Sequence, residues 1–251
     1  MPKPTVVVSD LHLGAPSSAE EEFIDFLKSW HGRAELVLVN GDLFDFWFEY
    51  RTVVPSQHFA VLKALSDLAA SGVRLILVGG NHDSWGGRFL EDEIGMRCLD
   101  GPVELELGGK RAILAHGDGV GPGDVGYKIL RRTLRSRPFR TLMRLVHPDL
   151  ADRFVQRISR TGARSAAERA RSGVRAKILE EYAAEQFETR ADIDLVIFGH
   201  CHIPQLRSFG AGRYYINSGD WIEHRTYTLV TPDEVRQREW DGRAPGEAGP
   251  A

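Results

Sequence analysis

Short apolar runs rich in Val, Ile and Leu recur along the chain and predict buried β-strands. They lie at 5–8, 35–39, 73–78, 111–115 and 194–198. A near-continuous apolar run, rather than an alternation of apolar and polar residues, is typical of a strand covered on both faces. The pattern therefore predicts a sheet enclosed between other layers.

Helical periodicity fills the gaps between the first three strands. Residues 19–30 place Phe23, Phe26, Leu27 and Trp30 on one face, and residues 59–70 do the same with Leu62, Leu65, Leu68 and Ala69. Alternation of strands and helices predicts crossover connections and a largely parallel sheet. The fold class is therefore α/β.

Later segments predict a second, mixed sheet. Residues 103–107 and 111–115 form a hairpin around "GGK", and residues 214–216, 227–230 and 235–239 form a meander. We expect a single domain over 1–240. It would carry a helical insert at about 125–190, broken at Pro138, Pro148 and Gly162. The Gly- and Pro-rich tail at 241–251 is predicted to be disordered.

Polar residues with metal-binding side chains follow five of the predicted strands. They are Asp10 and His12, Asp42, Asn81 and His82, His116, and His200 and His202. In open α/β folds, ligands bind beyond the carboxyl ends of the strands, so these side chains should converge. One Asp or His alone is typical of a turn, and His31, His58 and His147 are interpreted as hydrogen-bonded surface or core residues. Turn chemistry does not account for five imidazoles at strand ends.

The candidate ligands are His, Asp and Asn without Cys, which suits Mn²⁺, Fe²⁺ or Zn²⁺. Seven ligands exceed what one ion needs, whereas two ions about 3.5 to 4 Å apart can share a carboxylate. We assign Asp42 as the shared ligand. One ion would take Asp10, His12 and His202, and the other would take Asn81, His116 and His200.

Five sequence blocks resemble a known family. "SDLHLG", "NGDLFDFW", "GGNHD", "HGD" and "GHCH" are similar to the signature blocks of the calcineurin-like metallophosphoesterases, in the same order. The resemblance implies a four-layer αββα sandwich, a dinuclear centre and hydrolysis of a phosphate ester or anhydride. It makes Asn81 and His82 the catalytic pair, with His82 as general acid or charge-stabilising donor. Asp83 would orient an imidazole or cap a turn.

The net charge of −3 conceals a basic segment at 128–177, with fifteen Lys and Arg against three acidic residues. Such an excess predicts an anionic partner. Leu and Ile alternate with Arg there, which is typical of an amphipathic helix on anionic lipid, although an ordinary helical cap with a solvated basic face remains open. Without interleaved aromatic residues we expect no nucleic-acid partner.

The substrate prediction also comes from a resemblance. "DLFDFW", "HGDGVGPGDVGYKILRR" and "GHCHIP" are most similar to the UDP-2,3-diacylglucosamine pyrophosphatases of lipid A biosynthesis. That family implies hydrolysis of the pyrophosphate to UMP and 2,3-diacylglucosamine 1-phosphate, at the cytoplasmic face of the inner membrane, with Mn²⁺. Asp124 and Tyr127 match its motif, and Arg164 and Arg171 lie in the region that binds substrate.

Two departures from that family keep an alternative open. Its best-known branch has Arg where this chain has His82, and "YYINSGDWIEH" resembles a related branch. The alternative is a general phosphodiesterase or phosphatase acting on a soluble nucleotide or phosphoester. A non-catalytic scaffold is the less favoured reading, because the chain keeps all seven ligands and His82. No apolar run approaches about 18 residues and no signal peptide is evident, so we expect a cytoplasmic protein. The sequence does not indicate an oligomeric state.

Overall fold

The computed structural model describes residues 2–83, 85, 87–121, 132–133, 136–151, 153 and 166–244. Its first sheet has six strands in the order β11-β10-β1-β2-β3-β4. The bounds are β1 Thr5–Val8, β2 Leu36–Val39, β3 Arg74–Val78, β4 Met96–Leu99, β10 Thr226–Val230 and β11 Val235–Glu239. Strands β1 to β4 pair in parallel, whereas β10 and β11 are antiparallel to their neighbours.

The second sheet has five strands in the order β5-β6-β7-β9-β8. The bounds are β5 Val103–Leu107, β6 Lys110–Leu114, β7 Leu195–Phe198, β8 Gln205–Ser208 and β9 Tyr214–Asn217. Strands β6, β7 and β9 are parallel, and β5 and β8 are antiparallel edges. Both sheets are therefore mixed, and each has a parallel centre.

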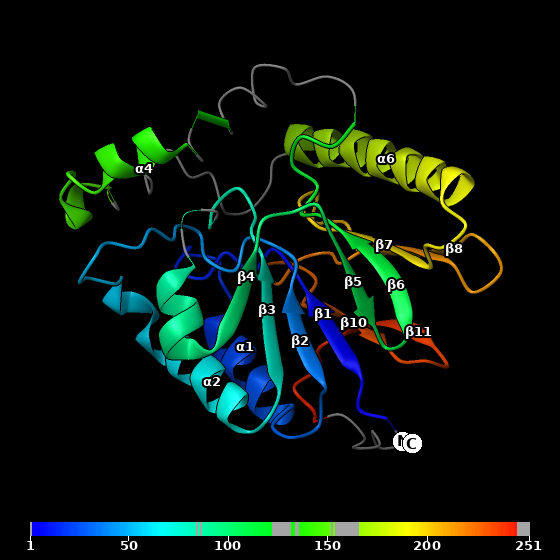
Figure 1. The fold of residues 1–251 in the computed structure, drawn as a ribbon, viewed down its shortest axis with the longest axis horizontal. Coiled ribbons are helices and arrows are strands. Elements are labelled where there is room, and N and C mark those ends of the chain that lie inside the picture. Colours follow the sequence, from blue (N-terminus) through cyan, green and yellow to red (C-terminus); the bar gives the residue numbers. More distant parts are fainter. Residues whose placement is uncertain are drawn as a thin grey trace.

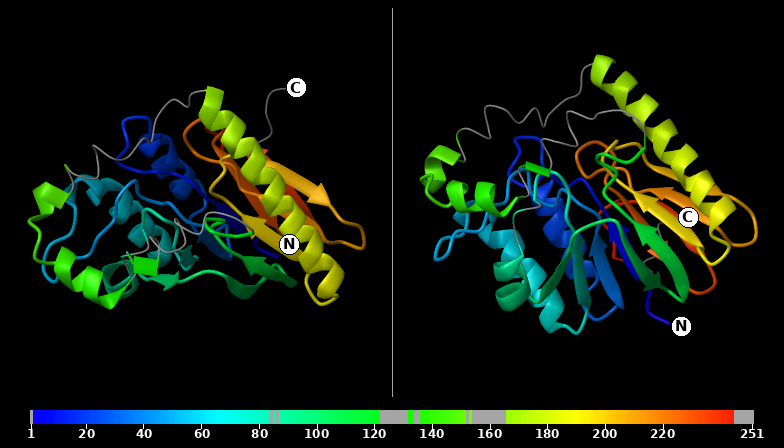
Figure 2. Two further views of the ribbon diagram at one scale, coloured as in Figure 1. Left: turned by 90° about the horizontal axis from the view of Figure 1, so that it is seen from above. Right: turned by 45° about the horizontal axis from the view of Figure 1, so that its top comes forward.

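Helices cover the two outer faces of the paired sheets (Figures 1 and 2). The helices α1 (Glu20–Ser29) and α2 (Phe59–Ala70) pack on the first sheet, and α6 (Ala166–Thr189) packs on the second. In β1, Val6 and Val8 face the helices while Val7 faces the other sheet, so successive residues contribute to different cores. This arrangement confirms the αββα layers and explains why the strands are apolar throughout.

The predicted meander is wrong in its sheet assignment. Strand β9 belongs to the second sheet, whereas β10 and β11 extend the first, with Val6 opposite Leu229. The partner of a strand is a long-range choice that local alternation does not encode. Strands β4 and β8 were not predicted from the sequence, because they are short sheet edges with exposed polar residues such as Arg97 and Arg207.

Part of the predicted insert lies within the described residues. The short helix α4 (Arg137–Met143) has Pro138 in its first turn, not at a break, and the Ser136 side chain accepts a hydrogen bond from the Phe139 backbone N–H. Gly162 and the tail residues 245–251 lie outside the described residues, so the domain bounds stay predictions. In the part of the chain that the structure describes, no helix is long and apolar enough to cross a membrane.

Candidate metal centre

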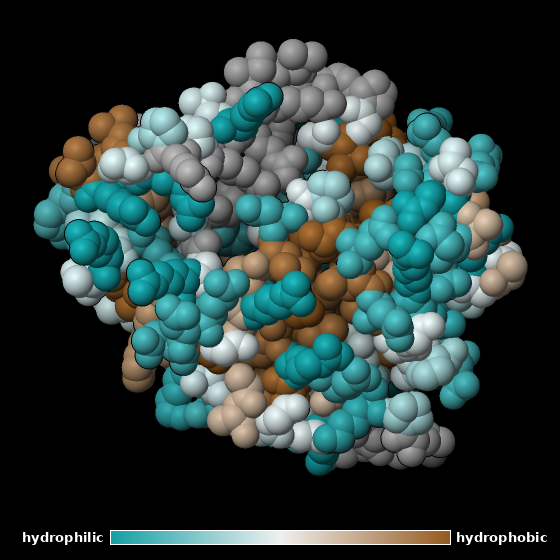
Figure 3. All heavy atoms as spheres, viewed as in Figure 1, coloured by the Kyte–Doolittle hydropathy of each residue, from teal (hydrophilic) through white to brown (hydrophobic). Residues whose placement is uncertain are grey.

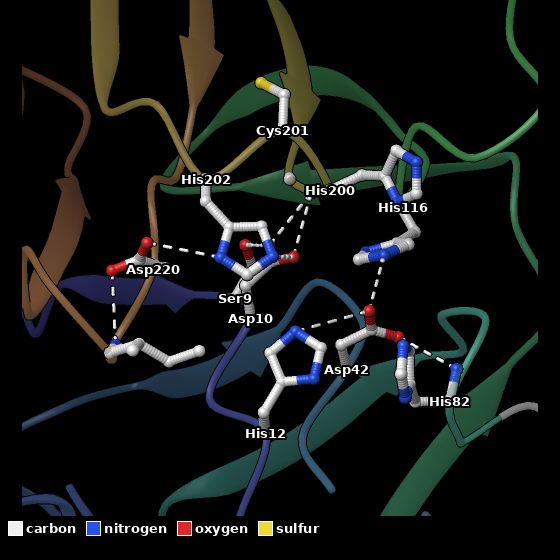
Figure 4. Close-up of polar contacts among 12 residues, drawn as sticks. Ser9, Asp10, His12, Asp42, His82, His116, His200, Cys201, His202 and Asp220 are labelled. Carbon is white, nitrogen blue, oxygen red and sulfur yellow. Dashed lines mark hydrogen bonds and ion pairs between the residues drawn. The ribbon is translucent and has the colours of Figure 1, made fainter. Parts of the chain in front are cut away.

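The candidate ligands all follow the carboxyl ends of parallel strands, as the strand-end rule predicts. Asp10 and His12 follow β1, Asp42 follows β2, Asn81 and His82 follow β3, His116 follows β6, and His200 and His202 follow β7. Because these strands run in parallel at the centres of two packed sheets, the loops from both sheets meet at one end of the sandwich (Figure 4).

Three groups of side chains there have the spacing of metal sites. The ligand atoms in each group lie within 4.8 Å of one another. The groups are Asp10, His12 and His202; Asp42, His116 and His200; and His12, Asp42 and His82. The first two correspond to the two predicted ions. Asp42 belongs to both the second and the third group. The third group places Asp42 next to His12, which is a predicted ligand of the other ion.

Five of the candidate ligands have a positive φ, in the left-handed region that residues other than Gly, Asn and Asp rarely adopt. They are Asp10 (φ 52°), His12 (φ 47°), Asp42 (φ 53°), His200 (φ 69°) and His202 (φ 56°). Only two other non-glycine residues of the described chain have a positive φ, Ala211 and Arg225. Such strain costs roughly 1 to 3 kcal/mol per residue and concentrates at functional sites. The backbone is therefore strained where the candidate ligands lie.

Two glycines allow the loops to approach the carboxylates closely. A Cβ atom on Gly80 would collide with the Asp42 side chain, and one on Gly199 would collide with Ser9 and Asp10. Each glycine thus lets the backbone of one loop pass against a carboxylate from another loop.

Hydrogen bonds to backbone carbonyl oxygens fix the orientation of two imidazoles. The Nδ1 atom of His116 lies 3.0 Å from the Asn40 carbonyl oxygen, and that of His82 lies 2.7 Å from the Asp45 carbonyl oxygen. A carbonyl oxygen only accepts, so each Nδ1 carries the hydrogen. The Nε2 atom is then the ring nitrogen available to an ion or a substrate, and in His116 it lies 3.1 Å from Oδ2 of Asp42.

Charges in the centre are strongly coupled. Burial opposes the charge on Asp42, but His116, His82 and His12 outweigh this effect and hold its pKa well below the usual range. Burial likewise opposes protonation of His116, yet Asp42 and Asp10 raise its pKa well above the usual range. Burial lowers the pKa of His12 and, together with the nearby His116 charge, that of His200. Without metal, the buried Asp42 carboxylate is compensated by the protonated imidazole of His116.

The pKa of His82 is also shifted. Burial opposes its charged form, but Asp42, Asp45 and Asp83 outweigh burial and raise the pKa. The backbone N–H of His82 donates to Oδ1 of Asp42 at 3.0 Å, which places the imidazole beside the shared carboxylate.

Two buried atoms indicate that the centre fits divalent metal. The Nε2 atom of His12 and the Oδ1 atom of Asn81 have no hydrogen-bond partner among the described residues. The His12 Nε2 lies 3.7 Å from Oδ2 of Asp42, which is too long for a hydrogen bond. Buried polar atoms are almost always paired, so atoms left unpaired beside carboxylates are those that a bound ion would satisfy. The His, Asp and Asn donor set suits borderline divalent ions.

The Asp83 carboxylate joins two loops. It accepts hydrogen bonds from the backbone N–H groups of Leu43 at 2.7 Å and Gly80 at 2.8 Å. Of the two roles considered for Asp83, these contacts favour the turn-capping role. Burial and the neighbouring Asp42 raise the pKa of Asp83 to about 6.

Two carboxylates near the imidazoles were not predicted from the sequence. Oδ1 of Asp45 lies 3.4 Å from Nδ1 of His12, and Oδ2 of Asp220 lies 3.2 Å from Nδ1 of His202. Asp220 follows the end of the parallel strand β9, so the strand-end rule could have found it. Asp45, in "GDLFD", lies beyond the strand end and had no comparable signal.

The predicted substrate-binding residues are only partly covered. Asp124, Tyr127 and Arg164 lie outside the described residues, and Arg171 is exposed on α6. One turn further along the same face, Arg175 donates a hydrogen bond from Nη2 to the Gly117 carbonyl oxygen at 2.7 Å. The end of α6 that carries Arg171 therefore lies near the loop that follows His116.

The model of one protein family, calcineurin-like phosphoesterase, matches residues 3–204. The chain belongs to this family. The match confirms the resemblance carried by the five sequence blocks. The chain is therefore a metal-dependent hydrolase. This conclusion follows from its membership of the family and from the groups of His and Asp side chains with metal-site spacing.

Similar calcineurin-like phosphoesterases include two proteins named UDP-2,3-diacylglucosamine hydrolase. The protein of Aeromonas hydrophila is 32% identical, over 92% of this chain and 96% of its own length. That of Porphyromonas gingivalis is 29% identical, over 93% of this chain and 92% of its own length. Among solved structures, vacuolar protein sorting 29 of Cryptosporidium parvum has a TM-score of 0.48 at 15% identity, covering 96% of this chain and 93% of its own.

Proposed function

We propose that this calcineurin-like phosphoesterase hydrolyses the pyrophosphate of UDP-2,3-diacylglucosamine to UMP and 2,3-diacylglucosamine 1-phosphate. The observation that carries this proposal is the similarity to the hydrolases named for that substrate, which extends over more than nine-tenths of this chain. The grouping of the candidate ligands supports the chemistry, because a pyrophosphate requires an activated water and neutralisation of charge on the phosphoryl oxygens.

The proposed centre holds two divalent ions, with Mn²⁺ as the expected metal. Asp10, His12 and His202 would hold one ion, Asn81, His116 and His200 would hold the other, and Asp42 would bridge them. When bound, such a pair supplies hydroxide near neutral pH and stabilises charge on phosphate. The protein contributes the fixed orientation of the imidazoles, with Nδ1 of His116 held by the Asn40 carbonyl oxygen.

His82 is proposed as the group that protonates the leaving oxygen. Its Nδ1–H is held by the Asp45 carbonyl oxygen, so Nε2 is the atom that can transfer a proton. The ring lies edge-on to that of His12 with centroids 4.7 Å apart, which places it against the proposed ion site (Figure 4). Asp124, Tyr127, Arg164 and Arg171 are proposed to bind the substrate.

We further propose that α4 and the residues after it contact the anionic inner-membrane surface, making the protein peripheral to the cytoplasmic face. Leu142, Leu145 and Leu150 are 59%, 82% and 59% exposed, and Figure 3 shows hydrophobic side chains at the surface over α4. Arg144 and Arg153 in the same stretch are exposed as well. An ordinary helical cap would bury these leucines, whereas an interfacial helix presents leucine and arginine together.

The experiment compares hydrolysis of UDP-2,3-diacylglucosamine in mixed micelles with hydrolysis of UDP-glucose and a chromogenic phosphodiester, each with Mn²⁺. A large preference for the lipid nucleotide is expected. Equal or faster turnover of the soluble compounds would instead support a general phosphodiesterase or phosphatase. Replacement of Asp42 by Asn should remove the second metal equivalent, measured by equilibrium dialysis, with Asp92→Asn on the exposed surface as the control.

A further inference from the structure

Asp220 is fully buried at the end of β9, and its two carboxylate oxygens have separate contacts. Oδ1 accepts hydrogen bonds from the backbone N–H groups of Ile222 at 3.2 Å, Glu223 at 2.8 Å and His224 at 3.0 Å. Oδ2 lies 3.2 Å from Nδ1 of His202 (Figure 4). One oxygen thus holds the loop at 222–224, and the other faces a candidate metal ligand.

Each ring nitrogen of His202 faces a carboxylate at 3.2 Å, Nδ1 that of Asp220 and Nε2 that of Asp10. Oδ1 of Asp220 already accepts three backbone N–H groups, so Oδ2 is the oxygen that can accept a hydrogen from Nδ1. An ion held by Asp10 would take Nε2, which leaves the hydrogen of the ring on Nδ1, facing Asp220. The lone pair then lies on Nε2, 3.2 Å from Oδ1 of Asp10.

We propose that Asp220 is a positioning residue for His202. It holds the imidazole in the tautomer whose Nε2 can bind an ion next to Asp10, and it fixes the rotation of the ring. A carboxylate behind a metal-binding histidine typically orients the ring and strengthens the ligand. The proposal rests on the two-ion centre of the proposed function and adds a residue that none of the five sequence blocks contains.

The same carboxylate connects the centre to α6. Glu223 lies in the loop that Asp220 holds, and it forms an ion pair with Arg169 of α6. The distance from Oε1 of Glu223 to Nη2 of Arg169 is 3.2 Å. His224 lies on the other side of the carboxylate, with Nδ1 3.3 Å from Oδ1. The side chain of His224 is 40% exposed and, within the described part of the chain, has no hydrogen bond or ion pair with a candidate ligand, so His224 is a suitable control.

The test uses Asp220→Asn in the full chain. Asparagine keeps an oxygen for the three backbone N–H groups but puts an amide nitrogen opposite His202, and that nitrogen cannot accept a hydrogen bond. We expect ¹⁵N NMR of the metal-free protein, at about pH 8, to show the His202 hydrogen on Nδ1 in the native chain and on Nε2 in the variant. Mn²⁺ affinity should fall by roughly 10- to 100-fold, with circular dichroism unchanged.

His224→Asn is the matched control and should leave both the tautomer and the Mn²⁺ affinity unchanged. An unchanged tautomer in Asp220→Asn would overturn the proposal, even if affinity fell, because the residue would then only support the loop. If Asp220→Asn does not fold, the native chain decides alone, since a hydrogen on Nε2 of its His202 contradicts the proposal. If the native chain binds no Mn²⁺, the two-ion centre is refuted. The tautomer of His202 in the metal-free chain would still test the role of Asp220.

Discussion

Nε2 of His116 lies 3.1 Å from Oδ2 of Asp42, and both side chains are almost completely buried. Burial opposes charge on each of them, yet their mutual attraction raises the pKa of His116, with help from Asp10, and lowers that of Asp42, with help from His82 and His12. In the metal-free protein they therefore form an ion pair. A divalent ion bound by His116 must displace its proton, because only the neutral imidazole coordinates metal.

We therefore expect Mn²⁺ affinity to rise with pH. The pKa of His116 is above its usual range, so the proton competes with the ion up to a higher pH than it would for an ordinary histidine. Titration calorimetry between about pH 6 and 8 in buffers of different ionisation enthalpy measures both the affinity and the protons released. Affinity that does not change with pH, with no proton release, would contradict the assignment of His116 as a ligand.

Replacement of His82 by Ala should slow catalysis without removing the metal. We expect kcat on the lipid nucleotide to fall by roughly 10² or more, because His82 no longer supplies a proton to the leaving phosphate oxygen, and much less on a 2,4-dinitrophenyl phosphodiester, whose leaving group is a weaker base. The backbone N–H that donates to Asp42 remains in the variant, so both Mn²⁺ equivalents should be retained. Equal losses on the two substrates would argue against the acid role.

The leucines after the first turn of α4 should mediate binding to vesicles. Leu142→Ser combined with Leu145→Ser is expected to reduce cosedimentation with phosphatidylglycerol vesicles at low salt several-fold, because less apolar surface enters the interface. Phe59→Ser is the matched control, since Phe59 is 71% exposed on α2, outside the basic segment. A similar loss from both changes would show that α4 is not the lipid-binding surface.

Acid should weaken the fold through His58, a buried residue outside the centre. Its ring packs at a tilt against the rings of Phe44 and Trp47, and burial lowers its pKa from 6.5 to about 4. The neutral form is favoured in the folded state, so this stability is present above about pH 6.5 and is lost as the pH falls toward 4. The full loss is about 3 kcal/mol in the free energy of unfolding.

His58→Gln measures this contribution. Urea unfolding at several pH values should show a smaller loss of stability on acidification in the variant than in the native chain. His31→Gln, at an exposed position, should follow the native curve. If the free energy of unfolding has the same pH dependence in the native chain and in His58→Gln, protonation of His58 does not contribute to the loss of stability in acid.

Much of the site was predictable because its residues obey a local rule. Asp10, Asp42 and His116 each follow a buried strand directly, and parallel strands bring such positions to the same end of a sheet. Asp220 obeys the rule too, but "SGDW" is indistinguishable from an ordinary turn unless β9 is known to be parallel to β7.

Other features depend on contacts that are distant in sequence. That β10 pairs with β1 is settled by the packing of Val6 opposite Leu229, not by the pattern of either strand. The left-handed backbone at His12 and His200 is not signalled by residue type either, because histidine rarely adopts it. It follows from the loops that the surrounding fold imposes.

The candidate centre takes its ligands from both sheets, with Asp10 and Asp42 from one and His116 and His200 from the other. The distance between these halves is set by the side chains packed between the sheets, such as Val7 and Ile197. Protein interiors are packed as densely as crystals, so this spacing resists small changes. If the centre holds divalent ions as proposed, the selection between ions of different radius would depend in part on apolar residues of the interior that are not ligands.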